Sequence, residues 1–152
     1  FIGEEARVLL FAGTPFTDDP RSFRKEVSAL RATGGGDEPE SSLDAVMLAL
    51  KQPFAADTSK IIVLVTDAPP HIPDRETKSV EEVSQAIRGG GIEQFYIVAR
   101  LQDSRNQVYH KLIEGTRGLA FELGRGSDFR ERAEHFKRTL MALSKTISQR
   151  TL

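Results

Sequence analysis

Carboxylates gather at two places in the chain where they could bind a cation together. Asp67 is separated from the apolar run 61–65 by one residue, Thr66. Asp37, Glu38 and Glu40 lie within a stretch of four residues that follows three glycines. Hard divalent cations such as Mg²⁺, Mn²⁺ and Ca²⁺ take oxygen ligands from separate loops, and Mg²⁺ keeps waters that a partner can displace. These residue types suit a divalent-metal site if folding brings the two places together.

The acidic loop also has a purely structural interpretation. Asp37 could cap a following helix by accepting backbone N–H groups, and Glu40 could reach back as the partner residue of a capping box. Negative charge also suits the positive end of a helix. On the residues alone, this helix-cap interpretation stands beside the metal interpretation.

The run 61–65 predicts the strand that places Asp67. Five consecutive apolar residues, four of them β-branched, are followed by Thr66, Asp67 and two prolines, which indicates a strand buried on both faces that stops abruptly. The carboxyl ends of parallel strands border the crevice in which open α/β sheets bind ligands. Asp67 is therefore expected at a binding edge.

Strand and helix signals alternate along the chain, which predicts an α/β fold with a doubly wound, mostly parallel sheet flanked by helices, in one domain over 1–152. Further strands are expected at 7–13, at a sheet edge, and at 95–99 and 118–123. Helices are expected to begin at Asp19, near Asp37, at Ser79 and at Asn106, and a closing helix is expected at 127–149. The first helix is expected to bury Phe23, Val27 and Leu30, and the one from Asn106 carries Tyr109 among its apolar residues.

Composition limits the classes of function. The chain has 21 basic and 22 acidic residues and a net charge of -1, so nucleic acid is not an expected partner. No run approaches the roughly 20 apolar residues of a membrane helix, so membrane insertion is not expected. The absence of cysteine excludes disulfides and zinc-thiolate sites, and it fits a reducing compartment such as the cytoplasm without fixing the location.

Catalysis is a competing class of function. A strand-end aspartate near a glycine-rich loop suits Mg²⁺-dependent phosphoryl transfer. The phosphate-binding pattern Gly-x-x-x-x-Gly-Lys-Ser/Thr and the nucleophile pattern Gly-x-Ser-x-Gly are both absent, and no second aspartate lies two residues after Asp67. The sequence therefore favours a binding domain over an enzyme.

The two motifs in this order resemble the von Willebrand factor A-type domain family. The loop Gly35-Gly36-Asp37-Glu38-Pro39-Glu40 with its following helix, and the strand ending Val65-Thr66-Asp67-Ala68-Pro69-Pro70-His71, are similar to bacterial members and to the I-like domain of integrin β subunits. Residues 118–123 also look like the last strand of that family. The resemblance implies a Rossmann-like sheet with a metal-ion-dependent adhesion site.

The resemblance also implies roles for particular residues. Glu40 and Asp67 would bind Mg²⁺, or Mn²⁺ or Ca²⁺, and Asp37 and the Pro39 carbonyl match positions that serve a neighbouring cation. The implied function is protein–protein interaction of an adhesion or assembly type, in which a carboxylate of the protein partner completes the coordination of the metal. The loops expected to border that ligand contain Gly35, Gly36, Glu38, Ser41, Ala68, Pro69 and His71.

One family motif is missing from this chain. No Asp-x-Ser-x-Ser sequence is present, and residues 7–13 look like the antiparallel edge strand of the family, so the first two strands and first helix would lie before Phe1. The fold would then be incomplete, with backbone groups unpaired along one side of the Asp67 strand. A segment that supplies the missing strands is an expected partner, and metal binding would be weak or absent without it. A metal-independent structural α/β interaction module is the alternative, since fold alone does not decide function.

Overall fold

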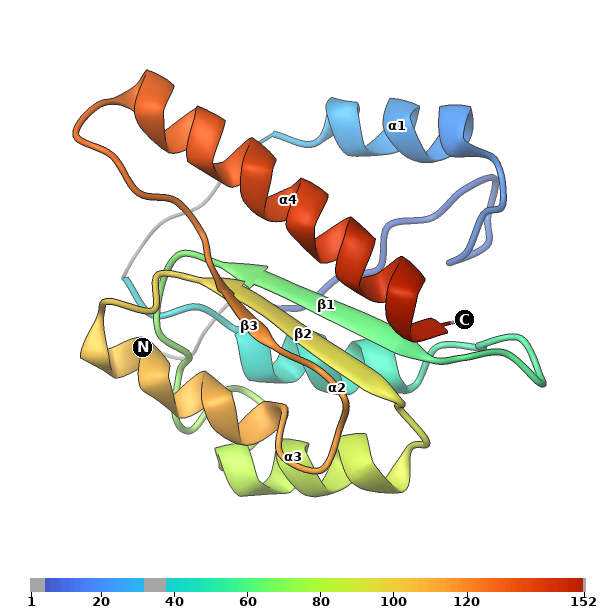
Figure 1. The fold of residues 1–152 in the computed structure, drawn as a ribbon. Coiled ribbons are helices and arrows are strands. Elements are labelled where there is room, and N and C mark those ends of the chain that lie inside the picture. The colour runs from blue at the N-terminus through green and yellow to red at the C-terminus, as the bar shows by residue number, and fades with distance from the viewer. Residues whose placement is uncertain (1–4, 32–37, 152) are drawn as a thin grey trace.

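The computed structural model describes residues 5–31 and 38–151, which form an α/β arrangement around one parallel sheet (Figure 1). Gly35, Gly36 and Asp37 lie outside the described residues. The elements in chain order are α1 Pro20–Ala29, α2 Ser42–Leu50, β1 Ile61–Thr66, α3 Val80–Gly89, β2 Gln94–Ala99, the 3₁₀ helix η1 Ser104–Leu112, β3 Ala120–Glu122 and α4 Phe129–Thr151. The predicted fold class is confirmed, with a sheet of three described strands.

The sheet has the strand order β1-β2-β3, and both pairs of strands are parallel. Val65 of β1 is paired with Val98 of β2, and Thr66 with Ala99. All six residues of β2 are buried, because this strand has a neighbour on each side and helices on both faces. The ends of β1 and β2 therefore lie next to each other at the edge where Asp67 follows.

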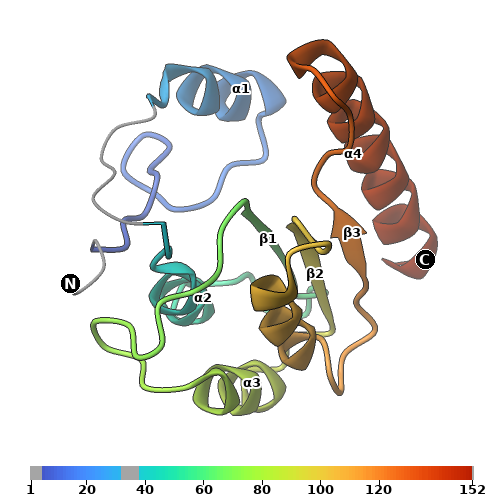
Figure 2. The same ribbon diagram turned by 90° about the vertical axis from the view of Figure 1, so that its left-hand side faces the viewer.

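Helices cover the two faces of the sheet unequally. One face packs against α2, α3 and η1, and the other packs against α4, the one described helix on that side (Figures 1 and 2). The first core contains Leu43, Val46, Ile62, Val80, Val83, Ile87, Ile92, Phe95, Ile97, Ala99, Tyr109 and Leu112. The second contains Tyr96, Val98 and Leu143, with Ile61, Phe121, Leu123, Phe136 and Ile147 packed around them. Among the described residues, none of the helices combines the length and the apolar composition that a membrane-spanning helix needs.

The prediction that β1 is buried on both faces is wrong. Val63 and Val65 are 39% and 49% exposed, whereas Ile62 on the opposite face is buried. Val63 and Val65 lie on the α4 side, because they are paired with Tyr96 and Val98. The second core, which α4 covers, contains neither valine. Within the described chain β1 has a strand neighbour on one side only, so some of its apolar side chains have no described element packed against them.

The predicted strand at 7–13 is not formed. Residues 5–10 have no regular structure, and Phe11 and Thr14 form an isolated antiparallel bridge that closes a tight turn. A strand requires a neighbour with which to exchange backbone hydrogen bonds, and no described strand lies beside this segment. The apolar run is therefore not sufficient for strand formation here.

Helix α1 begins where the sequence predicts, but its predicted buried face is wrong. The Asp19 side chain accepts hydrogen bonds from the backbone N–H groups of Arg21 and Ser22, which makes it the N-cap. Exposed fractions are 53% for Phe23, 40% for Val27 and 59% for Leu30, although Phe23 stacks on Phe11. The helix has an apolar face, and no described element covers it.

Candidate functional site

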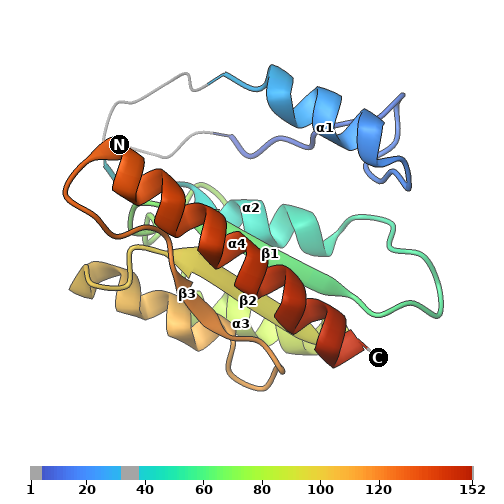
Figure 3. The same cartoon turned by 45° about the horizontal axis from the view of Figure 1, so that its top comes forward.

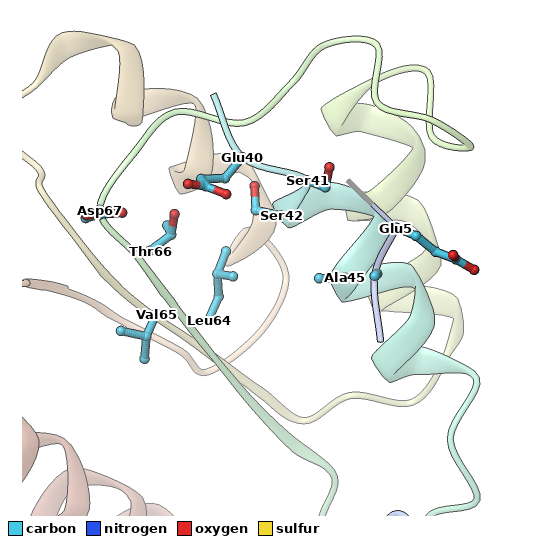
Figure 4. A pocket seen from close by; sticks show the side chains of 10 residues that line it. Glu5, Glu40, Ser41, Ser42, Ala45, Leu64, Val65, Thr66 and Asp67 are labelled. Atoms are coloured by element: carbon cyan, nitrogen blue, oxygen red, sulfur yellow. The ribbon is translucent and has the colours of Figure 1, made fainter. Parts of the chain in front are cut away.

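Glu40 and Asp67 line the same cavity at the carboxyl end of β1 (Figure 4). The cavity has a volume of about 330 Å³ and lies between β1 and the beginning of α2. Its other lining residues are Glu5, Ala6, Ser41, Ser42, Ala45, Leu64, Val65 and Thr66. The described structure therefore places the two acidic positions of the sequence motifs at one site.

Two backbone hydrogen bonds hold the acidic loop against the loop that follows β1. The Glu40 N–H donates to the Pro69 carbonyl at 2.8 Å, and the His71 N–H donates to the Glu40 carbonyl at 2.9 Å. These bonds form an isolated parallel bridge between Glu40 and Pro70. They bring the two sequence motifs into contact through main-chain atoms.

The capping-box interpretation of Glu40 is wrong. Helix α2 begins at Ser42 with Ser41 at its N-cap position, so Glu40 precedes the helix. Ser41 makes no side-chain cap hydrogen bond, and its buried hydroxyl has no hydrogen-bond partner. The physical reason is that the main chain of Glu40 pairs with the loop after β1 and does not enter the first helical turn.

Tyr109 of η1 joins the loop after β1 to the beginning of α2. Its hydroxyl donates to the Ala68 carbonyl at 2.9 Å and lies 2.8 Å from the Ser42 hydroxyl. The Thr66 hydroxyl donates to the same carbonyl at 3.1 Å. Burial raises the pKa of the Tyr109 phenol above its usual value, and the hydrogen bond with Ser42 partly offsets that rise in pKa. The sequence indicated Tyr109 only as an apolar position of a helix.

Two arginines lie at this edge of the sheet, and sequence reasoning missed both. Arg105 forms a two-pronged ion pair with Glu38, with N···O distances of 2.7 and 2.8 Å, and it also pairs with Asp103. The Arg105 hydrogen bond, followed by its charge, holds the pKa of Glu38 below its usual value. The Arg100 guanidinium lies 3.9 Å from the Asp67 carboxylate. Arg100 directly follows β2, so its position after a parallel strand was a usable signal.

The donors around the cavity fit a hard cation in type but not in number. Glu40 and Asp67 supply carboxylates, and Figure 4 shows the hydroxyls of Ser42 and Thr66 in the same wall of the cavity. Among residues 5–31 and 38–151, no group of three His, Cys, Asp or Glu side chains is placed to hold a metal ion. The Arg100 charge beside Asp67 also opposes a cation. The described residues therefore form at most part of a metal site.

The other predicted site residues have these positions. The Pro69 carbonyl and the His71 amide are used in the bridge to Glu40, and the Ala68 carbonyl accepts from Tyr109. Pro39 lies between Glu38 and Glu40, and no described contact assigns it a role. Gly35, Gly36 and Asp37 lie outside the described residues, so their predicted roles stay predictions.

Two aspartates that were missed from the sequence, Asp44 and Asp74, hold the loop after β1 in place. The buried Asp44 carboxylate of α2 accepts hydrogen bonds from the N–H groups of Glu76 and Thr77, the latter at 2.9 Å. Asp74 in turn accepts from the Asp44 N–H at 3.2 Å. These bonds fasten the loop after β1 to the beginning of α2.

Comparison with known proteins gives two matches. The family model described as von Willebrand factor A domain matches residues 11–125. Hemicentin-1 of Mus musculus is 30% identical over 98 residues, which cover 64% of this chain and 2% of that protein. No solved structure matches the chain significantly.

Proposed function

Because this chain belongs to the von Willebrand factor A domain family, we propose that it is a non-catalytic protein–protein interaction domain whose ligand site is the cavity at the carboxyl end of β1. Domains of this family commonly mediate interactions between proteins. The observation that supports this site most directly is the joint lining of one cavity by Glu40 and Asp67. The main-chain bridge between their loops adds support, because it fixes the two motifs side by side.

The metal-assisted form of this function uses Mg²⁺ or Mn²⁺ at Glu40 and Asp67. The cation would supply a positively charged centre to which a carboxylate of the protein partner adds as a ligand. Further oxygen ligands have to come from outside the described residues, and Asp37 is the nearest candidate in sequence. Without them we expect weak binding of the cation.

The second candidate is metal-independent binding at the same edge. It is favoured by one observation, the Arg100 guanidinium 3.9 Å from Asp67, because a cationic side chain already stands beside the proposed metal ligand. In this form Arg100 itself presents positive charge to an acidic partner. Both candidates use the same edge of the sheet and differ in the source of its positive charge.

Calorimetric titration with Mg²⁺ and Mn²⁺ tests the metal-assisted form on three variants of the 152-residue chain. Asp67→Ala should abolish cation binding, and Arg100→Ala should strengthen it because a repelling charge is removed. Glu114→Ala is the matched control, since Glu114 is exposed and does not line the cavity. Absence of binding heat in the unaltered chain and in Arg100→Ala would refute the metal-assisted form and leave the metal-independent one.

A further inference from the structure

Another cavity lies on the β3 side of the sheet, between the first turns of α4 and the loop that leads to them. Its volume is about 480 Å³. Figure 3 shows this loop turning back at the beginning of α4, which crosses in front of the sheet. The Thr139 hydroxyl donates to the Glu122 carbonyl at 3.1 Å, so this part of α4 is fastened to β3. The cavity shares no lining residue with the one at the carboxyl end of β1.

The segment that forms this cavity is basic. Residues 125–151 contain seven Lys or Arg residues and three Asp or Glu residues, whereas the rest of the chain contains 14 and 19. Arg125 lines the cavity from the loop, and Arg130 and Arg138 line it from α4. Residues at steps of four lie on one face of a helix, so Arg130 and Arg138 are on the same side of α4.

These three arginines have no ion-pair partner among the described residues. Two carboxylates, Glu131 and Glu134, line the same cavity. Glu131 accepts from the Ser127 amide at 2.7 Å and from the Ser127 hydroxyl at 2.9 Å, and these bonds hold the pKa of Glu131 below its usual value. The carboxylate of Glu131 is therefore engaged in holding the loop. Positive charge exceeds negative charge around the cavity.

The loop that carries Arg125 is fixed in position by the first turn of α4. Gly126 has a φ of 142°, and a Cβ added there would lie 2.4 Å from the Cβ of Glu131, so the loop passes closer to the helix than a side chain would allow. The Asp128 carboxylate accepts from the Glu131 amide at 2.9 Å. Arg125 is thus held beside α4 before any ligand arrives, which lowers the cost of ordering on binding.

Three guanidinium groups around one cavity suit an anion with two charges and several oxygen atoms. The planar fork of arginine donates paired hydrogen bonds to a phosphate, whereas a single carboxylate occupies only one such fork. His135 also lines the cavity, and its buried Nδ1 atom has no hydrogen-bond partner among the described residues. The volume lies within the range of about 300–1,000 Å³ for small-ligand sites, which leaves room for the group that carries the phosphate.

We propose that this cavity binds a doubly charged phosphate group, as the free ion or as a monoester, through the guanidinium groups of Arg125, Arg130 and Arg138. The proposal goes beyond the protein-binding function proposed above and uses neither Glu40 nor Asp67. It requires no metal.

NMR titration of the 152-residue chain labelled with ¹⁵N tests the proposal at about pH 7.5, where a phosphomonoester carries nearly two negative charges, and at an ionic strength of about 0.15 M. The probes are a short glycine peptide with one central phosphoserine, the same peptide with glutamate in that position, and inorganic phosphate. The phosphopeptide should shift the Nε–H resonances of the three arginines, with a Kd about tenfold lower than that of the glutamate peptide. Inorganic phosphate that binds as tightly as the phosphopeptide would identify the free ion as the ligand, and weaker binding would identify the monoester.

Three variants make the test specific. Arg138→Gln should raise the Kd of the phosphopeptide about tenfold, because it removes charge-assisted hydrogen bonds. Glu134→Gln should lower that Kd about threefold, because it removes a repelling carboxylate from the cavity. Lys145→Gln is the matched control on the same helix, since Lys145 is exposed and does not line the cavity. It lies about 10 Å along the helix from Arg138, beyond the screening length of about 8 Å, so the Kd should change less than about twofold.

Three outcomes would overturn the proposal. The first is the absence of a saturable shift in the arginine resonances with either phosphate probe. The second is equal binding of the glutamate peptide, which would assign the effect to charge alone. The third is equal weakening by Lys145→Gln and Arg138→Gln, which would assign the whole basic face of α4 to a long polyanion. None of the variants touches the cavity at β1, so failure of the function proposed there leaves this result unaffected.

Discussion

Replacement of Tyr109 by Phe should destabilise the chain by removing one hydroxyl from a fully buried position. The ring stays in place, so the change leaves almost no cavity. The Ala68 carbonyl keeps the bond from Thr66 at 3.1 Å, whereas the Ser42 hydroxyl, in a residue 5% exposed, loses the partner 2.8 Å away. A buried hydroxyl left without a partner costs about 1–3 kcal/mol of stability, so we expect the free energy of unfolding to fall by about 2 kcal/mol.

Urea denaturation of four proteins measures this effect as a double-mutant cycle. Ser42→Ala alone should cost about 1 kcal/mol, because the Tyr109 hydroxyl still donates to Ala68. The double variant should cost less than the sum of the two single variants by about 1 kcal/mol, since it removes both partners together. The reasoning is refuted if the two effects add, or if Tyr109→Phe alone changes the free energy of unfolding by less than about 0.5 kcal/mol.

The pH dependence of stability gives an independent check on Tyr109. Burial raises the folded-state pKa of its phenol above the value of 10.0 for the exposed group. The unfolded chain therefore releases this proton first, and the stabilisation is complete below pH 10 and is lost as the pH rises through the folded pKa. Tyr109→Phe should make the alkaline part of the stability curve flatter.

Three further changes test other parts of the structure. Gly118→Ala would place a Cβ 1.6 Å from a carbonyl oxygen of β2, so thermal unfolding should show a loss of stability of at least about 2 kcal/mol. In Gly89→Ala the added Cβ has no atom within 4 Å, so the stability should hardly change. NMR titration should give Glu38 a pKa below its ordinary value of 4.5, and Arg105→Gln should return that pKa toward 4.5. The ion pair stabilises the fold at neutral pH, and its contribution is lost as the pH falls through the lowered pKa of Glu38. Asp44→Asn should cost about 1–3 kcal/mol and speed amide exchange at the two loop amides that it holds, and unchanged exchange there would contradict the role given to this carboxylate.

The sequence was most informative where one local pattern determines the outcome. The runs containing Val65 and Val98 are strands, and Ser79 caps α3 by accepting from the Glu82 N–H. The prediction that acidic residues of both motifs meet at one edge holds for Glu40 and Asp67. The position of Asp67 followed from topology, because it comes directly after a parallel strand, whereas Glu40 follows no described strand and is held there by its bridge to Pro70.

The sequence failed where the outcome depends on what lies opposite. The spacing of Phe23, Val27 and Leu30 shows that a helix has an apolar face, but it cannot show whether another element covers that face. The same holds for Val63 and Val65, which the apolar run 61–65 predicts to be buried and which are exposed in the structure.

Long-range polar partners were missed for a related reason. The bonds of Tyr109 to Ser42 and Ala68 join positions 67 and 41 residues apart, and Arg105 lies 67 residues from Glu38. No local spacing records such pairs. Of the residues missed at this site, only Arg100 has a usable local signal, because it directly follows a strand.

The small bridge between Glu40 and Pro70 would lower the free-energy cost of binding at the proposed ligand site. A ligand that touches two independent loops has to immobilise both, and ordering them takes up part of the interaction free energy. Here the Glu40 N–H and carbonyl already fix one loop on the other, at 2.8 and 2.9 Å, before any ligand arrives. The two loops are preorganised, so a ligand that makes few contacts at the cavity would lose little free energy to ordering them.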